Sequence, residues 1–137
     1  MKRHGFTMIE LVFVIVIVGV LASIAASKLN FGRSDAELVN ARTQIAAINS
    51  AITLKYNEKV LTGKPAYPNT LDGDDGLLFS GVLTIGGIRE GNSKRGWVKL
   101  QDNKYKFSLD GQSTTYTYYP ESGLFVCDDS YLCNQLK

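Results

Sequence analysis

Histidine is nearly absent from this chain of 137 residues, whose only copy is His4. Cysteine is also scarce, since the sequence contains only Cys127 and Cys133. A single C-x5-C pair cannot supply the four ligands of a structural zinc site. If residues 1–5 are removed, the mature chain keeps no histidine at all. This would exclude both Ser-His-Asp and Cys-His catalysis. Serine–lysine and carboxylate chemistry need no histidine, but the sequence favours a protein that is not an enzyme.

A strong charge of one sign is missing too. The formal net charge of +2 comes from Lys2 and Arg3, and without them the remaining basic residues balance the 13 acidic ones. Net charge therefore gives no reason to expect binding to a polyanion. The hydrophobic content of 45% and the charged content of 20% are ordinary for a folded protein. The length suits one domain with an additional element.

What the sequence does contain is a long apolar run near its start. From Phe6 to Ser27, a stretch of 22 residues, the side chains are apolar or small except for Thr7, Ser23 and the acid Glu10. At ~1.5 Å per residue, a helix of this length spans roughly 33 Å, about the hydrocarbon core of a bilayer. An acid at that depth is costly unless it is paired, whereas at the interface it is simply hydrated. The residues alone leave both alternatives open.

The flanks of this run allow three interpretations. Lys2 and Arg3 precede it, which favours a cytoplasmic N-terminus and an exported remainder. A plain anchor would fit, and so would a secretory signal cut near Ala26 or Ser27 in front of a secreted enzyme. However, the run is longer than the usual ~7–15 residues of a signal peptide, and Glu10 interrupts its start.

The third interpretation comes from the segment "GFTMIE", Gly5–Glu10, followed by the apolar run. It resembles the class III leader of type IV pilins and type II secretion pseudopilins. The resemblance implies that prepilin peptidase cuts between Gly5 and Phe6 and that the new N-terminus of Phe6 is methylated. It also implies that Glu10 acts in assembly by meeting the amine of a neighbouring subunit. The chain departs from the family at "AASKL", where many pilins have a proline after the apolar run and this chain has Ser27.

The same resemblance implies a function and a location. The protein would be a pilin-like filament subunit, a pseudopilin of a type II secretion or DNA-uptake system. Its partners would be other copies or paralogous subunits, membrane lipid, and an inner-membrane assembly platform with its ATPase. It would span the bacterial inner membrane once, with a periplasmic C-terminal domain. The alternatives are a subunit of a surface type IV pilus and a membrane-anchored periplasmic binding module.

The remaining sequence predicts an α+β fold in which a long N-terminal helix packs on a small C-terminal antiparallel sheet. An apolar stripe at helical spacing continues the helix, either unbroken or hinged at Gly32. Period-two patterns at 82–88, 96–100, 104–109, 115–119 and 123–127 predict strands, with "QDN" and "DGQS" as hairpin connections. The expected parts are a leader at 1–5, a transmembrane helix at 6–29, its amphipathic continuation at 30–62, and a periplasmic globular part at 63–137.

Three further groups are candidate sites. In an oxidising compartment Cys127 and Cys133 would form a disulfide. The acids of "DGDDG" are weak candidates for calcium ligands, since a solvated turn is the simpler explanation and no cofactor is otherwise expected. Basic residues between aromatic ones are candidates for nucleic-acid binding, against the alternative of solvated strand faces over a core. These two sets are Asp72, Asp74 and Asp75, and Lys94, Arg95 and Lys99.

Overall fold

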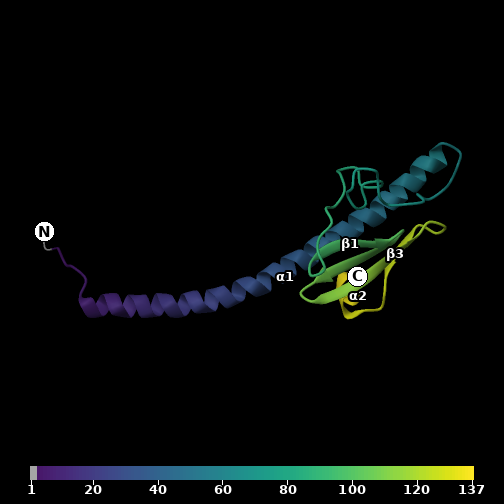
Figure 1. The fold of residues 1–137 in the computed structure, drawn as a ribbon. Helices are drawn as coiled ribbons and strands as arrows, with labels where there is room; N and C mark the ends of the chain where they lie inside the picture. The colour runs from purple at the N-terminus through teal and green to yellow at the C-terminus, as the bar shows by residue number, and fades with distance from the viewer. Residues whose placement is uncertain (1–2) are drawn as a thin grey trace. The chain divides into compact units, whose positions relative to one another are not determined.

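The computed structural model describes residues 3–137, apart from the side chains of Asn30 and Phe31. Met1 and Lys2, part of the predicted leader, therefore lie outside the described residues. Within residues 3–137, six elements follow one another (Figure 1). They are α1 (Met8–Leu61), β1 (Gly96–Gln101), β2 (Lys104–Leu109), β3 (Gln112–Tyr119), β4 (Leu124–Cys127) and α2 (Tyr131–Leu136). The prediction of an α+β fold is confirmed.

The chain forms two compact units, Met1–Ala36 and Glu37–Lys137, and the boundary between them falls within α1. We call them unit 1 and unit 2. Helix α1 passes through Gly32 without interruption, so one continuous helix is observed rather than two helices separated by a break. A glycine at an interior position costs only about 1 kcal/mol relative to alanine, which a helix of 54 residues tolerates.

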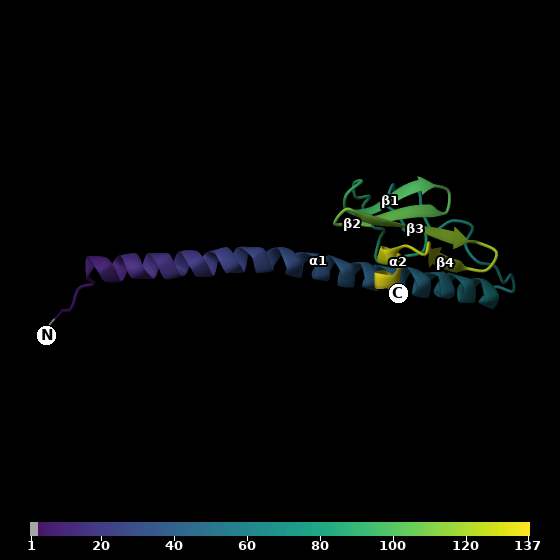
Figure 2. The same ribbon diagram turned by 90° about the horizontal axis from the view of Figure 1, so that it is seen from below.

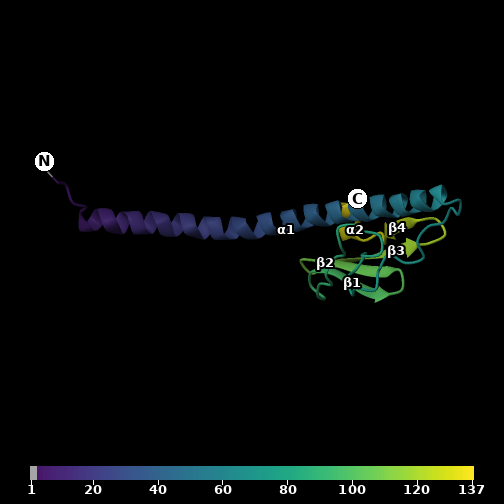
Figure 3. The same cartoon turned by 90° about the horizontal axis from the view of Figure 1, so that it is seen from above.

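In unit 2, α1 buries the stripe that its sequence predicts. The apolar side chains at steps of three and four face the core, and Ile48 is fully buried. At the end of the stripe, the rings of Tyr56 and Tyr67 stack with centroids 4.4 Å apart. The second half of α1 runs along the chain's own sheet, as Figures 2 and 3 show from opposite sides, and the stripe belongs to the same core cluster as the sheet residues. Its buried members are Ala41, Ile45, Ile48, Ala51 and Ile52.

The sheet is an antiparallel meander with the order β1-β2-β3-β4. Both predicted hairpins are present, at Asp102-Asn103 and at Asp110-Gly111. Asp110 and Gly111 both have positive φ, 49° and 76°, which matches the right-handed twist of the flanking strands. Alternation along β2 places Tyr105 on the core side, where its ring meets that of Phe79 at 4.5 Å.

The predicted strand at 82–88 is wrong. Val82 and Leu83 donate backbone hydrogen bonds to the carbonyl of Phe79 and form a turn, and only Ile88 makes a single bridge, to Leu78. Gly86 has a φ of 98°, and at Gly87 a Cβ would lie 2.5 Å from the side chain of Leu77. These glycines allow a tight loop, which the local apolar alternation does not reveal.

Candidate functional site: the N-terminal segment

The predicted cleavage site lies in a segment without regular secondary structure. Residues 3–7 precede α1 and all of them are exposed. Nothing lies within 4 Å of the position that a Cβ would take on Gly5. The Gly5–Phe6 peptide bond is therefore exposed in a segment without helix or strand, the kind of segment in which proteolytic cleavage concentrates. Phe6 itself is exposed and precedes the first turn of the helix.

Glu10 has a partner within its own chain. The amide of Glu10 donates to Oγ1 of Thr7 at 3.2 Å, and the amide of Thr7 donates to Oε2 of Glu10 at 3.4 Å. The carbonyl of Thr7 accepts the first helical hydrogen bond, from Leu11 at 3.1 Å. These three bonds make Thr7 the N-cap of α1 and form a capping box with Glu10.

This capping box adds a second role for Glu10 to the one that the sequence predicts. The sequence contains the signature of such a box, which is T-x-x-E before an apolar run. In a nonpolar environment the first amides of a helix have no water to bind, so the box satisfies groups that would otherwise be costly. Both residues follow the Gly5–Phe6 bond, so cleavage there leaves the box intact.

Apolar side chains surround α1 on all sides from Leu11 to Ala26 in unit 1. Every large hydrophobic residue from Phe6 to Ile24 is exposed within the chain. A helix that is hydrophobic all round requires burial in lipid or in an assembly. By length and composition α1 is the one helix among the described residues that could cross a membrane; its most apolar 18-residue window has a mean hydropathy of 2.8, and none of it is buried.

The predicted disulfide is confirmed, since Cys127 and Cys133 are bonded. The short loop that it closes is fastened by further contacts. Asp128 accepts hydrogen bonds from the hydroxyl of Thr114 at 2.6 Å and from the amide of Thr115 at 3.2 Å, and Ser130 caps α2. Burial opposes ionisation of Asp128, but the hydrogen bonds from Thr114 and Ser130 prevail and lower its pKa. The disulfide therefore clamps the end of β4 to α2.

The three candidate calcium ligands do not converge. Asp72 accepts hydrogen bonds from the amide of Phe79 at 2.8 Å and from the hydroxyl of Tyr105 at 3.0 Å, and it pairs with Lys99 at 2.8 Å. Asp75 instead accepts from Ser80, which lowers the pKa of Asp75. Asp74 is exposed. Within residues 3–137 no group of three or more potential metal-ligating side chains is found.

Two of the three candidate nucleic-acid cations are paired with acids. Arg95 contacts Glu37 at 2.9 Å and Asp110 at 3.3 Å, while Lys99 contacts Asp72. Lys94 is exposed. The neighbouring aromatic rings are not available for stacking on bases, because Trp97 is buried and its Nε1 donates to Gln44 at 3.0 Å. This geometry is that of a solvated strand face over a core.

Comparison with known proteins agrees with the geometry of the N-terminal segment. Residues 1–26 match the family model described as "Prokaryotic N-terminal methylation motif". The resemblance drawn from "GFTMIE" is therefore confirmed for the start of the chain.

A relative is similar over a longer stretch. Over 98 residues the chain is 30% identical to the type II secretion system core protein G of Escherichia coli (strain K12). The alignment covers 72% of this chain and 63% of that protein, so it spans less than two thirds of the relative's length. No solved structure matches the chain.

Proposed function

We propose that the protein is a pilin-like structural subunit of a type IV filament, most closely a pseudopilin of a type II secretion or DNA-uptake system. Prepilin peptidase cuts between Gly5 and Phe6 and methylates the new amine. The chain then spans the bacterial inner membrane once, with unit 2 in the periplasm. An inner-membrane platform and its ATPase assemble it with other copies or paralogous subunits.

The observation that carries this proposal is the position of the capped helix. A helix that is apolar on all sides starts two residues after the proposed new N-terminus, and its cap contains the one acid of the segment. Cleavage would create an ammonium group on Phe6 close to the hydrocarbon core of the membrane, where an unpaired charge is costly. Two copies displaced along the helix by four residues would bring the Phe6 amine of one to Glu10 of the other. Each charge would then be neutralised.

The similarity to a protein named as a type II secretion core component favours secretion over a surface pilus. The accessible Gly5–Phe6 bond and the family match at residues 1–26 support the processing step. The role is structural: the apolar helix supplies the assembly surface, and unit 2 supplies the outer part of the fibre.

Three substitutions separate the two roles of Glu10. Glu10→Gln keeps a side-chain oxygen for the Thr7 amide but removes the charge, so the cap survives and the pairing with an amine does not. Thr7→Val removes the hydroxyl of the cap and leaves the charge. Glu10→Val removes both. We expect Glu10→Gln and Glu10→Val to abolish assembly in membranes that carry the complete machinery, and Thr7→Val to reduce it less.

Two measurements test the processing of the chain and its assembly. Intact mass and N-terminal sequencing of protein from native membranes should give a chain that begins at Phe6 with one added methyl group. Multimers should be detected by a lysine-reactive cross-linker. Normal assembly of Glu10→Gln would show that Glu10 serves the cap alone. A chain that begins at Met1 or near Ser27 would contradict the proposal and favour an anchored or secreted domain.

A further inference from the structure

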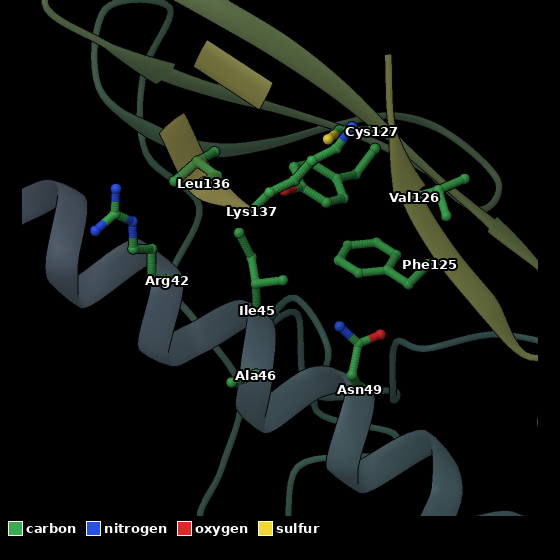
Figure 4. Close-up of a pocket in the computed structure, with 10 residues that line it drawn as sticks. Arg42, Ile45, Ala46, Asn49, Phe125, Val126, Cys127, Leu136 and Lys137 are labelled. Carbon is green, nitrogen blue, oxygen red and sulfur yellow. The ribbon is translucent and has the colours of Figure 1, made fainter. Parts of the chain in front are cut away.

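Unit 2 contains an apolar groove that nothing within the described chain fills. It has a volume of about 490 Å³ and lies between α1, β4 and α2 (Figure 4). Its floor is apolar and buried, whereas its rim is exposed and carries two cations and no acidic side chain among its described lining residues. The floor consists of Ile45, Tyr116, Phe125 and Leu136, and the rim includes Arg42, Ala46, Asn49, Val126 and Lys137.

The same unit carries one apolar side chain that projects from it. Ile85 is 92% exposed, at the tip of the loop that replaces the predicted strand. The base of this loop is anchored, because Val82 is buried and Ile88 exchanges two backbone hydrogen bonds with Leu78, of 2.7 and 2.8 Å. Two glycines follow Ile85, so no side chain widens the tip on that side. An anchored, narrow loop with an apolar tip is suited to insertion into a pocket.

The groove and the loop lie on different flanks of α1. The helix lines the groove with Arg42, Ile45, Ala46 and Asn49. The loop at 82–85 instead borders a second, smaller pocket together with Ala47, Ser50, Ala51 and Leu54 of the helix. At 3.6 residues per turn the centres of these two sets point about 140° apart around the helix axis. One molecule therefore cannot fill its own groove with its own loop, but a second copy at its side can.

We propose that the Ile85 loop of one copy inserts into the groove of a second copy of this chain. This inference rests on the proposed filament function. The contact joins two different surfaces, so it is heterologous, and repetition of such a contact produces an open helical array when the rotation does not close. Charge supports the pairing, since Asp75 accepts a hydrogen bond from Ser80, which lies beside Gly87 at the base of the same loop, and the rim of the groove carries Arg42 and Lys137.

The axial offset of this contact fits a filament. The helix residues beside the loop lie on average five positions after those that line the groove, which corresponds to about 7.5 Å at 1.5 Å per residue. Pairing of Glu10 in one subunit with the Phe6 amine of another requires an axial offset of four residues, about 6 Å. The two offsets have the same direction if the subunit that provides the groove also provides the amine. The two contacts, derived from different units, demand similar displacements.

Site-directed cross-linking of the full chain in its native membranes tests the contact. The variant Ala46→Cys/Ile85→Cys is treated with a short bismaleimide, which joins thiols and leaves the Cys127–Cys133 disulfide intact. We expect a ladder of dimers and larger species that is lost when Glu10→Val is added. The matched control, Ala46→Cys/Leu100→Cys, places the second thiol at an exposed leucine on β1 and should give no ladder.

The outcomes separate this inference from the proposed function. If a lysine-reactive cross-linker shows multimers of a chain that begins at Phe6 but the cysteine pair gives no ladder, the groove contact is wrong and the filament proposal stands. A ladder in the Leu100 control also overturns the contact. If the chain is monomeric in its native membranes, both proposals fail.

A second pair of variants tests the same contact without cysteines. Ile85→Asp should reduce multimers at least tenfold, whereas Ile85→Leu should preserve them. Because Ile85 is almost fully exposed, neither substitution should change thermal unfolding of unit 2. Multimers of Ile85→Asp at the wild-type level would overturn the inference.

Discussion

The two parts of α1 form the same secondary structure but obtain their burial in different ways. In unit 2 a single stripe faces the chain's own sheet, and most of the remaining helix positions are exposed. From Met8 to Ala26 in unit 1, apolar residues occupy every side of the helix and none of them is buried within the chain. A stripe on one side defines an intramolecular partner, whereas apolar residues on all sides require an external one. Unit 2 therefore buries its own core, whereas the apolar part of unit 1 needs burial outside the chain, which the proposed function assigns to lipid and other subunits.

The largest difference in the free energy of unfolding should appear when the same truncation, Ile→Ala, is made in each unit. Ile48→Ala removes a fully buried side chain and should destabilise unit 2 by about 2–5 kcal/mol. Ile15→Ala makes the same chemical change on an exposed position of unit 1 and should leave unit 2 unaffected. Trp97, the single tryptophan, is buried in unit 2, so its fluorescence during urea unfolding of the full chain in detergent reports on that unit.

Equal destabilisation by both variants would show that the two units unfold together. In that case the contrast between a folded domain and an assembly surface would be wrong. The helical signal of far-ultraviolet circular dichroism, followed in the same titration, should keep the contribution of unit 1 after the tryptophan signal of wild type is lost.

A smaller effect is expected from the disulfide, which belongs to unit 2 alone. Cys127→Ala/Cys133→Ala opens a loop of six residue steps and should cost about 2 kcal/mol in the chain-entropy model. The urea midpoint of tryptophan fluorescence measures the loss. Reductant should bring the wild type to the same midpoint and leave the variant unchanged, and a variant as stable as wild type would show that the Asp128 contacts hold β4 and α2 together unaided.

The smallest expected change is a loss of stability of unit 2 at alkaline pH. Burial, followed by the charge of Asp128, raises the pKa of Tyr116 to about 12, and burial likewise raises the pKa of Tyr118. The hydrogen bond to Asp72 raises the pKa of Lys99. A raised folded-state pKa contributes stability that is complete below the unfolded-state pKa, near 10, and is lost as pH rises through the folded value.

We therefore expect the stability of unit 2 to fall between about pH 10 and pH 12. Tyr116→Phe should make this decline shallower than in wild type, since it removes one of the titrating groups. Urea midpoints at several pH values would measure the slope. An unchanged slope in Tyr116→Phe would assign the alkaline loss to the other groups.

Features encoded in short segments could be predicted from the sequence. The leader motif, the apolar run, the stripe from Ala41 to Ile52 and the alternation in β2 each depend on residues close together in the chain. The pairing of Cys127 with Cys133 could be predicted because only two cysteines exist. The capping box of Thr7 and Glu10 is equally local, and the three-residue spacing T-x-x-E was sufficient to predict it.

Other features depended on residues that meet only in the folded chain. The apolar alternation at 82–88 predicted a strand, but the folded loop places Gly87 against Leu77 and leaves Ile85 in solvent. The acids and cations suggested calcium and nucleic acid until Asp72 was found beside Lys99, and Arg95 beside Glu37. Local periodicity cannot report such pairs, because it carries no information about residues distant in sequence.

By itself, the sequence determined that an apolar helix follows a leader-like motif and that the helix continues into an α+β fold. Only the tertiary structure decided which charges neutralise one another, which apolar loop stays exposed, and where a groove remains between α1, β4 and α2. The physical reason is that hydrophobic period is a property of adjacent turns and strands, whereas ion pairs and grooves arise where separate segments pack together.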